Sequence, residues 1–200
     1  IYDCVERNGF RAVMTSSDHR SGTERVEEAY RNLGSDADVV INVQGDEPFI
    51  QPAQIEKLAG IFTSRPDTRI ATLAKRFDPK AGFDALFDPN LVKLTFSHDK
   101  EALYFSRSII PYVRRTDWKN WLKEEEFFTH IGIYAYRADT LRDIVNLPES
   151  SLERAESLEQ LRWLQNGFPI RLEVSEFSTI GIDTPADLEQ AEEYLKQETR

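Results

Sequence analysis

The 200-residue sequence has a single cysteine, Cys4, and lacks any apolar run near the roughly 20 residues that a membrane-spanning helix needs. One cysteine cannot form an internal disulfide, which is typical of proteins in a reducing compartment. The sequence also shows no signal peptide. The expected location is therefore cytoplasmic.

Basic residues are scarce relative to acidic ones. The chain has 25 Lys and Arg against 35 Asp and Glu, a formal net charge of −10. General nucleic-acid binding depends on a basic surface, so this balance argues against it. An anionic substrate would have to be held by a local group of arginines. With 9 Gly, 9 Pro and 40 % hydrophobic residues, the composition is globular rather than collagen-like or mostly disordered.

The order of the expected elements indicates an α/β layered fold. Short strands are expected at 11–16, 39–43 and 70–73, with amphipathic helices between them. The 39–43 run is nearly continuously apolar, as in a strand of a parallel sheet that is covered on both faces.

The pattern changes in the middle of the chain, where alternating, aromatic-rich segments predict antiparallel strands. Helices and one more strand follow, at 139–146, 152–166, 170–174 and 185–197. We therefore predict one domain over 1–200, with a doubly wound, mostly parallel sheet and a smaller antiparallel insertion at 75–137.

The chain opens on a helical pattern that ends at Asn8-Gly9, but no N-cap residue precedes Ile1. We expect that the natural protein continues before Ile1. The alternative is a short N-terminal helix that has lost only its initiator Met.

Two aspartates follow expected strands. Asp46 lies directly after the 39–43 strand, and Asp183 precedes a helix that Thr184 and Pro185 would begin, so helix capping does not explain Asp183. Ligands of open α/β sheets bind beyond the carboxyl ends of strands. Carboxylates there suit Mg²⁺ and phosphate oxygens, although a plain turn would explain each residue as well.

Other polar residues allow a structural and a functional interpretation. Ser21 to Glu24 form a capping box, whose free N–H groups can also bind an anion. Arg107 is an even number of residues from Leu103 and Phe105, which predicts that it points to the same apolar side of its strand. A guanidinium there needs an anionic partner, from the substrate or the protein. His130, Tyr134 and Tyr136 fall on one strand face, which could line a polyhydroxylated ligand or simply pack.

Six stretches resemble, in order, the 3-deoxy-manno-octulosonate cytidylyltransferase (CMP-Kdo synthetase) family. They span most of the chain: MTSSDHRSGTER at 14–25, NVQGDEP at 42–48, ALYFSR at 102–107, HIGIY at 130–134, LEQLR at 158–162 and GIDTP at 181–185.

The resemblance implies a nucleotidyltransferase-like fold and a cytoplasmic homodimer, with the antiparallel insertion helping to form the dimer. It implies an enzyme of lipopolysaccharide biosynthesis that couples CTP to Kdo and releases pyrophosphate, with Mg²⁺. The anomeric hydroxyl would attack the α-phosphorus in line, without a protein nucleophile.

The resemblance also assigns residues. Asp46 and Asp183 would hold the metal and serve catalysis. The nucleotide would meet Thr15, His19, Ser21, Gly22, Thr23, Arg25 and Gln44. The sugar acid would meet Gln44, Arg107, His130, Tyr134, Glu159 and Gln160, with Arg107 pairing with its carboxylate.

One departure from the family matters. Members begin with a strand and a basic, glycine-containing loop that cradles the triphosphate, and no such stretch is present here. We therefore expect a chain that truly starts at Ile1 to be inactive.

Three alternatives stay open. The first is a cytidylyltransferase for another sugar acid, such as a sialic acid. The second is a metal-dependent glycosyltransferase, although its candidate motif at 36–38 precedes a strand instead of following one. The third is a folded, inactive fragment that binds without turnover.

Overall fold

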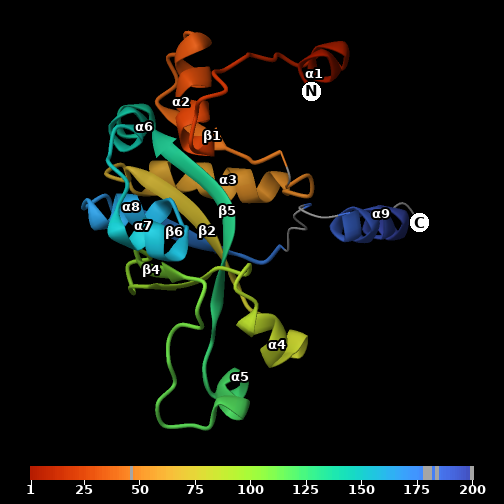
Figure 1. The fold of residues 1–200 in the computed structure, drawn as a ribbon, viewed down its shortest axis with the longest axis vertical. Helices are drawn as coiled ribbons and strands as arrows, with labels where there is room; N and C mark the ends of the chain where they lie inside the picture. The colour runs from red at the N-terminus through yellow and green to blue at the C-terminus, as the bar shows by residue number, and fades with distance from the viewer. Residues whose placement is uncertain (46, 178–181, 183–184, 199–200) are drawn as a thin grey trace.

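A mixed six-stranded sheet forms the centre of the computed structural model, which describes residues 1–45, 47–177, 182 and 185–198 (Figure 1). The longest strand, β5 (Phe128–Arg137), pairs antiparallel with β2 (Ile70–Arg76) along one edge. On the far side of β2, β6 (Ile170–Ser175) pairs with it in parallel.

The other edge of β5 is shared by two strands. β1 (Val39–Asn42) pairs with its C-terminal end, and β3 (Lys93–Phe96) pairs with its first two residues. β4 (Ala102–Ser106) continues the sheet beyond β3. The middle of β5 therefore lies between the ends of two neighbouring strands, and the candidate site forms there.

A bulge interrupts β5 at this point. Thr72 is opposite Tyr134 and Ala74 is opposite His130, so three residues of β5, 131–133, face the single β2 residue Leu73. Gly132 lies in the bulge with φ +55°, a left-handed conformation that glycine adopts at little cost. Thr72 and Ala74 lie on the same face of β2, so their partners Tyr134 and His130 lie on the same face of β5, as predicted.

Helices cover both faces of the sheet (Figure 1). On one side, α3 (Pro52–Ser64) packs its Leu58 and Phe62 against alternate β2 and β5 residues. The other side is covered by the remaining core helices, α6 (Ala138–Val145), α7 (Ser151–Glu156) and α8 (Gln160–Gln165). The doubly covered α/β architecture is the one predicted.

The remaining elements lie around this core. α2 (Gly22–Asn32) packs beside α6. At the opposite end of the molecule lie η1 (Pro79–Ala81), α4 (Gly82–Phe87), η2 (Trp118–Asn120) and α5 (Trp121–Glu124), held by a small core that includes Phe77, Leu86 and Trp121. α9 (Pro185–Glu198) ends the described chain. In the part of the chain that the structure describes, no helix has the length and apolar character to cross a membrane.

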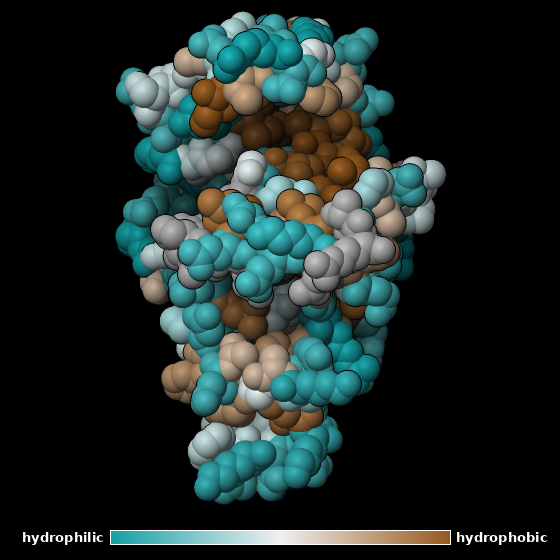
Figure 2. Space-filling view, turned by 90° about the vertical axis from the view of Figure 1, so that its right-hand side faces the viewer, coloured by the Kyte–Doolittle hydropathy of each residue, from teal (hydrophilic) through white to brown (hydrophobic). Residues whose placement is uncertain are grey.

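The N-terminal part packs less tightly. α1 (Tyr2–Arg7) has no buried residue and lies away from the sheet (Figure 1). Phe10 and Met14, in the segment that follows, are exposed. Figure 2 shows a hollow lined by apolar side chains on this side of the molecule.

The expected sheet was mostly parallel, but among the described strands only β2 and β6 pair in parallel and the other pairings are antiparallel. Four further sequence expectations differ from the structure. Residues 11–16 form no strand, because no described strand lies beside them to complete a ladder. The 39–43 strand is only half-buried, since among the described strands β1 pairs with β5 alone. The expected helix at 152–166 is divided where Ser157 takes φ 52°. The segment 128–137, expected in an antiparallel insertion, is instead the central strand of the main sheet.

Candidate functional site

A cavity of about 220 Å³ opens beside the β5 bulge, and we call it the His130 cavity. It joins the first turn of α2, the end of β1, the middle of β5 and the start of α8. Its lining consists of Gly22, Thr23, Asn42, Gln44, Val92, His130, Gly132, Tyr134, Tyr136, Leu158, Glu159, Gln160 and Trp163. The predicted site residues among them are Gly22, Thr23, Gln44, His130, Tyr134, Glu159 and Gln160.

The start of α2 and the turn before α8 meet at Glu159. The Ser21 hydroxyl donates to its Oε1 and the Thr23 hydroxyl to its Oε2, each over 2.8 Å. Arg162 Nη2 donates to the same Oε1 over 2.6 Å. Ser21 also accepts a hydrogen bond from the amide of Glu24, so it begins α2 as predicted. Residues predicted for the nucleotide therefore contact a residue predicted for the sugar acid.

The bulge in β5 presents backbone carbonyls that accept hydrogen bonds from two side chains, one in the segment after β1 and one in β2. Gln44 Nε2 donates to the carbonyl of Gly132 over 3.2 Å. The Thr72 hydroxyl donates to the carbonyl of Ile133 over 2.7 Å. Bulges leave such groups outside the regular ladder, and they occur often beside active sites.

His130 is a partly buried titratable group in the wall of the cavity. Burial lowers the pKa of His130 to about 3, so the ring is neutral near pH 7. Phe105 meets the ring edge-on, with 5.1 Å between centroids, and Tyr134 lies 5.0 Å from it. A neutral imidazole can donate a hydrogen bond from one ring nitrogen and accept one at the other, but it cannot neutralise an anion.

Buried polar atoms of the lining that have no hydrogen-bond partner among the described residues include the hydroxyl of Tyr134 and Nε1 of Trp163. Burial holds the pKa of Tyr134 well above its usual value, so the hydroxyl keeps its proton. Buried polar groups are nearly always paired, so these two donors suit a polar ligand in the cavity.

Four residues predicted for the nucleotide do not line this cavity: Ser21, which still contacts Glu159, and Thr15, His19 and Arg25. Arg25 Nη1 donates to Thr15 Oγ1 over 2.7 Å. His19 bonds to Glu28 through Nε2, and its Nδ1 lies 3.8 Å from Glu24. These contacts organise the segment before α2, and a nucleotide contact of these residues remains a prediction.

The structure places Arg107 away from the His130 cavity. Its Nε, Nη1 and Nη2 donate to the carbonyls of Glu156, Pro89 and Ser157. The last carbonyl groups of a helix have no hydrogen-bond donor within the helix. At the end of α7 the Arg107 guanidinium donates to two of them, those of Glu156 and Ser157. The sequence-based expectation of a guanidinium that awaits a substrate carboxylate thus differs from what the described residues show.

Arg107 instead lines a second cavity, of about 660 Å³, which we call the Trp118 cavity. Its other lining residues are Phe83, Asp84, Phe87, Ser108, Ile109, Tyr112, Trp118 and Trp121. Aromatic rings dominate it, and the Phe83 ring lies tilted against Trp118 with 4.6 Å between centroids.

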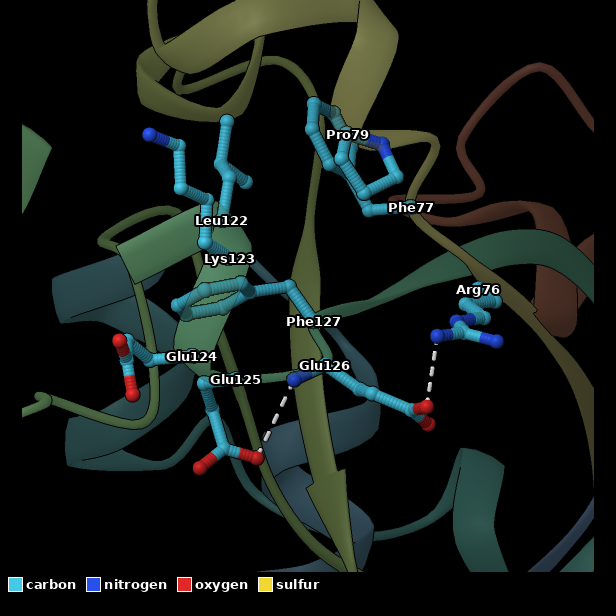
Figure 3. Close-up of a pocket in the computed structure, with 9 residues that line it drawn as sticks. All are labelled: Arg76, Phe77, Pro79, Leu122, Lys123, Glu124, Glu125, Glu126 and Phe127. Atoms are coloured by element: carbon cyan, nitrogen blue, oxygen red, sulfur yellow. Dashed lines mark hydrogen bonds and ion pairs between the residues drawn. The ribbon is translucent and has the colours of Figure 1, made fainter. Parts of the chain in front are cut away.

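Asp46 and Asp183, the predicted metal ligands, lie outside the described residues. Within the described part of the chain, no group of three or more His, Cys, Asp or Glu side chains could hold a metal ion. The acidic run at 124–126 lines a smaller hollow, and Figure 3 shows its carboxylates pointing apart, with Glu126 paired to Arg76 over 2.6 Å.

Sequence reasoning missed several contributors. Trp163 lies one helical turn after Gln160, so the periodicity of α8 could have indicated it. Asn42 ends β1, two residues before Gln44. Thr72 and Arg162 are buried polar residues within otherwise apolar patterns, and such residues need a partner.

The chain is similar to known cytidylyltransferases. A family model described as Cytidylyltransferase matches residues 1–197. The 3-deoxy-manno-octulosonate cytidylyltransferase of Phocaeicola vulgatus is 53 % identical, over 98 % of this chain and 78 % of its own length. The enzyme of the same name from Bacteroides thetaiotaomicron is 52 % identical over the same shares.

The chain is also similar to solved structures of nucleotidyl-transferring enzymes. A CMP-2-keto-3-deoxy-manno-octonic acid synthetase in complex with CTP superposes with a TM-score of 0.88 at 39 % identity, covering 98 % of this chain and 77 % of that one. A putative glucose-1-phosphate thymidylyltransferase from Bacillus anthracis has a TM-score of 0.58 at 13 % identity, over 96 % of this chain and 70 % of that one, which shows a shared fold alone.

Proposed function

This chain belongs to the cytidylyltransferase family, and from that premise we propose that it transfers the cytidylyl group of CTP to 3-deoxy-manno-octulosonate (Kdo). The products are CMP-Kdo and pyrophosphate, and the pathway is lipopolysaccharide biosynthesis. The observation that carries the proposal is the contact of Ser21 and Thr23 with Glu159, since it joins the nucleotide and sugar segments of the family at one cavity.

The chemistry of the His130 cavity suits a sugar acid with several hydroxyl groups. Tyr134 and Trp163 offer unpaired donors, and Glu159 and Gln160 add acceptor oxygens. We expect Gln44, which donates a hydrogen bond to the bulge, to contact both substrates. The protein's task is to bring the sugar hydroxyl and the α-phosphorus together, which supplies much of the rate increase in such a transfer.

A divalent metal ion completes the proposal. Asp46 and Asp183 are the residues that would hold Mg²⁺, because carboxylate oxygens are its usual protein ligands. When bound, Mg²⁺ would stabilise negative charge on the phosphate oxygens. We expect Asp46→Asn or Asp183→Asn to weaken Mg²⁺ binding at least about 100-fold, since loss of even a residue that supports a ligand costs about 10- to 100-fold.

A homodimer in the cytoplasm is the assembly and location we propose. Support for the dimer comes from the segment 75–137, where Phe87, Tyr112 and Trp118 are exposed around the Trp118 cavity. Large exposed aromatic groups of this kind are typical of interfaces. Analytical ultracentrifugation tests both points: a wild type that sediments as a monomer would contradict the dimer, and a Tyr112→Arg variant that still sediments as a dimer would contradict this interface.

Pyrophosphate release by the natural protein, with CTP and Mg²⁺, tests the activity. We expect release with Kdo and at least about tenfold less with a sialic acid, the rival substrate, because a misplaced hydroxyl leaves cavity groups unpaired. Equal or faster release with the sialic acid would favour the second candidate. Transfer from a nucleotide sugar without pyrophosphate release would contradict both.

A further inference from the structure

Thr72 is a fully buried polar residue in the middle of the apolar strand β2. Its Oγ1 lies 2.8 Å from Nε2 of His130 and 2.7 Å from the carbonyl oxygen of Ile133. The register of β2 explains both contacts, because Thr72 sits beside the bulge of β5 that carries His130 and Ile133.

The two contacts fix where the protons lie. A threonine hydroxyl has one hydrogen to donate, and a carbonyl oxygen can only accept. The Thr72 hydrogen therefore lies toward Ile133. Toward His130, Thr72 must accept, so Nε2 of His130 carries a hydrogen.

The other ring nitrogen of His130 is then determined as well. A neutral imidazole with a hydrogen on Nε2 has a lone pair on Nδ1. Burial lowers the pKa of His130 to about 3, which keeps the ring neutral at pH 7. Among the described residues, none forms a hydrogen bond with Nδ1, while His130 itself lines the cavity.

We propose that Thr72 is a positioning residue that holds His130 in its Nε2-protonated form, so that Nδ1 accepts a hydrogen bond from a hydroxyl of the bound ligand. The tautomer follows from the two contacts of Thr72 alone, whereas the identity of the ligand as a sugar acid rests on the proposed function. A carboxylate would be disfavoured at this point, because it would face a lone pair. Thr72 thereby sets which face of the sugar can meet β5.

Nitrogen-15 NMR of histidine-labelled protein at pH 7 tests the tautomer. The chain has only 3 histidines, so the spectrum is simple, and His130→Gln assigns the signal. We expect one protonated nitrogen, Nε2, and one unprotonated nitrogen, Nδ1, for His130 in the wild type. A hydrogen on Nδ1 would overturn the proposal, and this measurement needs no folded Thr72 variant.

Two variants then test the role of Thr72. Thr72→Val keeps the shape of the side chain but removes the acceptor, so His130 should show a mixture of tautomers and the KM for Kdo should rise about tenfold, the cost of about one good hydrogen bond. The KM for CTP should stay within about twofold, because the two contacts that Thr72→Val removes, with His130 and with the carbonyl of Ile133, involve no residue predicted to bind the nucleotide. Thr72→Ser, which keeps the hydroxyl, should restore both the spectrum and the KM for Kdo.

The outcomes separate the two proposals. A wild-type spectrum with the expected tautomer but no Kdo-dependent pyrophosphate release would contradict the proposed function and leave the role of Thr72 standing. Normal pyrophosphate release together with a Thr72→Val spectrum identical to that of the wild type would contradict the role of Thr72 and leave the proposed function standing. Equal increases in both KM values would also overturn it, because they would indicate a general loss of structure.

Discussion

The two cavities differ in how their polar groups are held. The Trp118 cavity is the larger, about 660 Å³ against about 220 Å³, yet aromatic rings form most of its wall and Tyr112 remains 75 % exposed. In the His130 cavity, Glu159 binds hydroxyls from a helix more than a hundred residues away in the chain. Convergence of buried polar groups from distant segments, rather than volume, distinguishes a site for chemistry from a surface for packing.

The largest effect should follow from removing Glu159. Arg162 is only 3 % exposed, and Glu159→Ala would leave its charge with one carboxylate neighbour, Glu153, at 3.6 Å. We expect a loss of about 3 kcal/mol in the free energy of unfolding, measured by urea denaturation, because an underpaired buried charge is costly. Glu149→Ala removes an exposed pair with Arg154 and should cost less than about 1 kcal/mol.

A comparable loss for both variants would contradict this distinction, since it would mean that Arg162 does not depend on Glu159. Such a result would remove the polar network as the feature that sets the His130 cavity apart.

Acid should destabilise the protein through His130. The pKa of His130 is lowered by burial to about 3, so below the usual value of 6.5 the unfolded chain binds a proton that the folded chain does not. Stability is complete above pH 6.5 and falls, as the pH drops toward 3, by about 1.4 kcal/mol per pH unit from this group. Urea denaturation between pH 6 and 4 should show a shallower dependence for His130→Gln than for the wild type.

His98→Gln provides the matched control, because His98 is exposed and lies outside both cavities. It should keep the wild-type pH dependence. Equal slopes for the wild type and His130→Gln would show that His130 is accessible to protons and would break the contrast with the exposed histidine.

The bulge of β5 should be sensitive to a single methyl group. Gly132 has φ +55°, and an alanine there would pay about 1–2 kcal/mol for the left-handed conformation. Gly60, exposed in α3 with no atom within 4 Å of an added Cβ, should respond with the opposite sign. Gly60→Ala should stabilise by about 0.5–1 kcal/mol, as measured by thermal or urea unfolding. A neutral or stabilising Gly132→Ala would mean that the bulge is not held in this conformation.

Local patterns predicted much of the fold and less of the site. The cap at Ser21, a strand at 70–73 and most helices followed from periodicity and capping. Burial on both faces was predicted for 39–43 but occurs in β2. The position of β5 could not be predicted, since pairing between distant strands leaves no local signal. The parity argument for Arg107 also had a physical flaw: the register shift in β4 leaves Leu103 exposed while Phe105 is buried.

The residues of the candidate site were likewise predicted only in part from the sequence. The resemblance grouped His130, Tyr134 and Glu159, and the structure brings these three to one cavity. Spacing could not predict that Thr72, 58 residues before His130, would contact its ring. Asp46 and Asp183 lie outside the described residues, so their convergence stays a prediction.

The smallest expected effect comes from Tyr134→Phe, and it tests most directly whether the His130 cavity binds a ligand. Tyr134→Phe deletes one buried hydroxyl that has no partner among the described residues, so the free energy of unfolding should not fall. If that hydroxyl binds the sugar acid, the KM for Kdo should rise about 2- to 10-fold, equivalent to one ordinary hydrogen bond, while the KM for CTP stays constant. Tyr30→Phe is the reciprocal control: its hydroxyl donates to the carbonyl of Ala37 over 2.9 Å, far from the cavity lining. It should lose about 0.5–1 kcal/mol of stability and leave both KM values unchanged. If Tyr134→Phe instead lost stability at constant KM, the hydroxyl would be structural, and the His130 cavity would be a packing defect like any other.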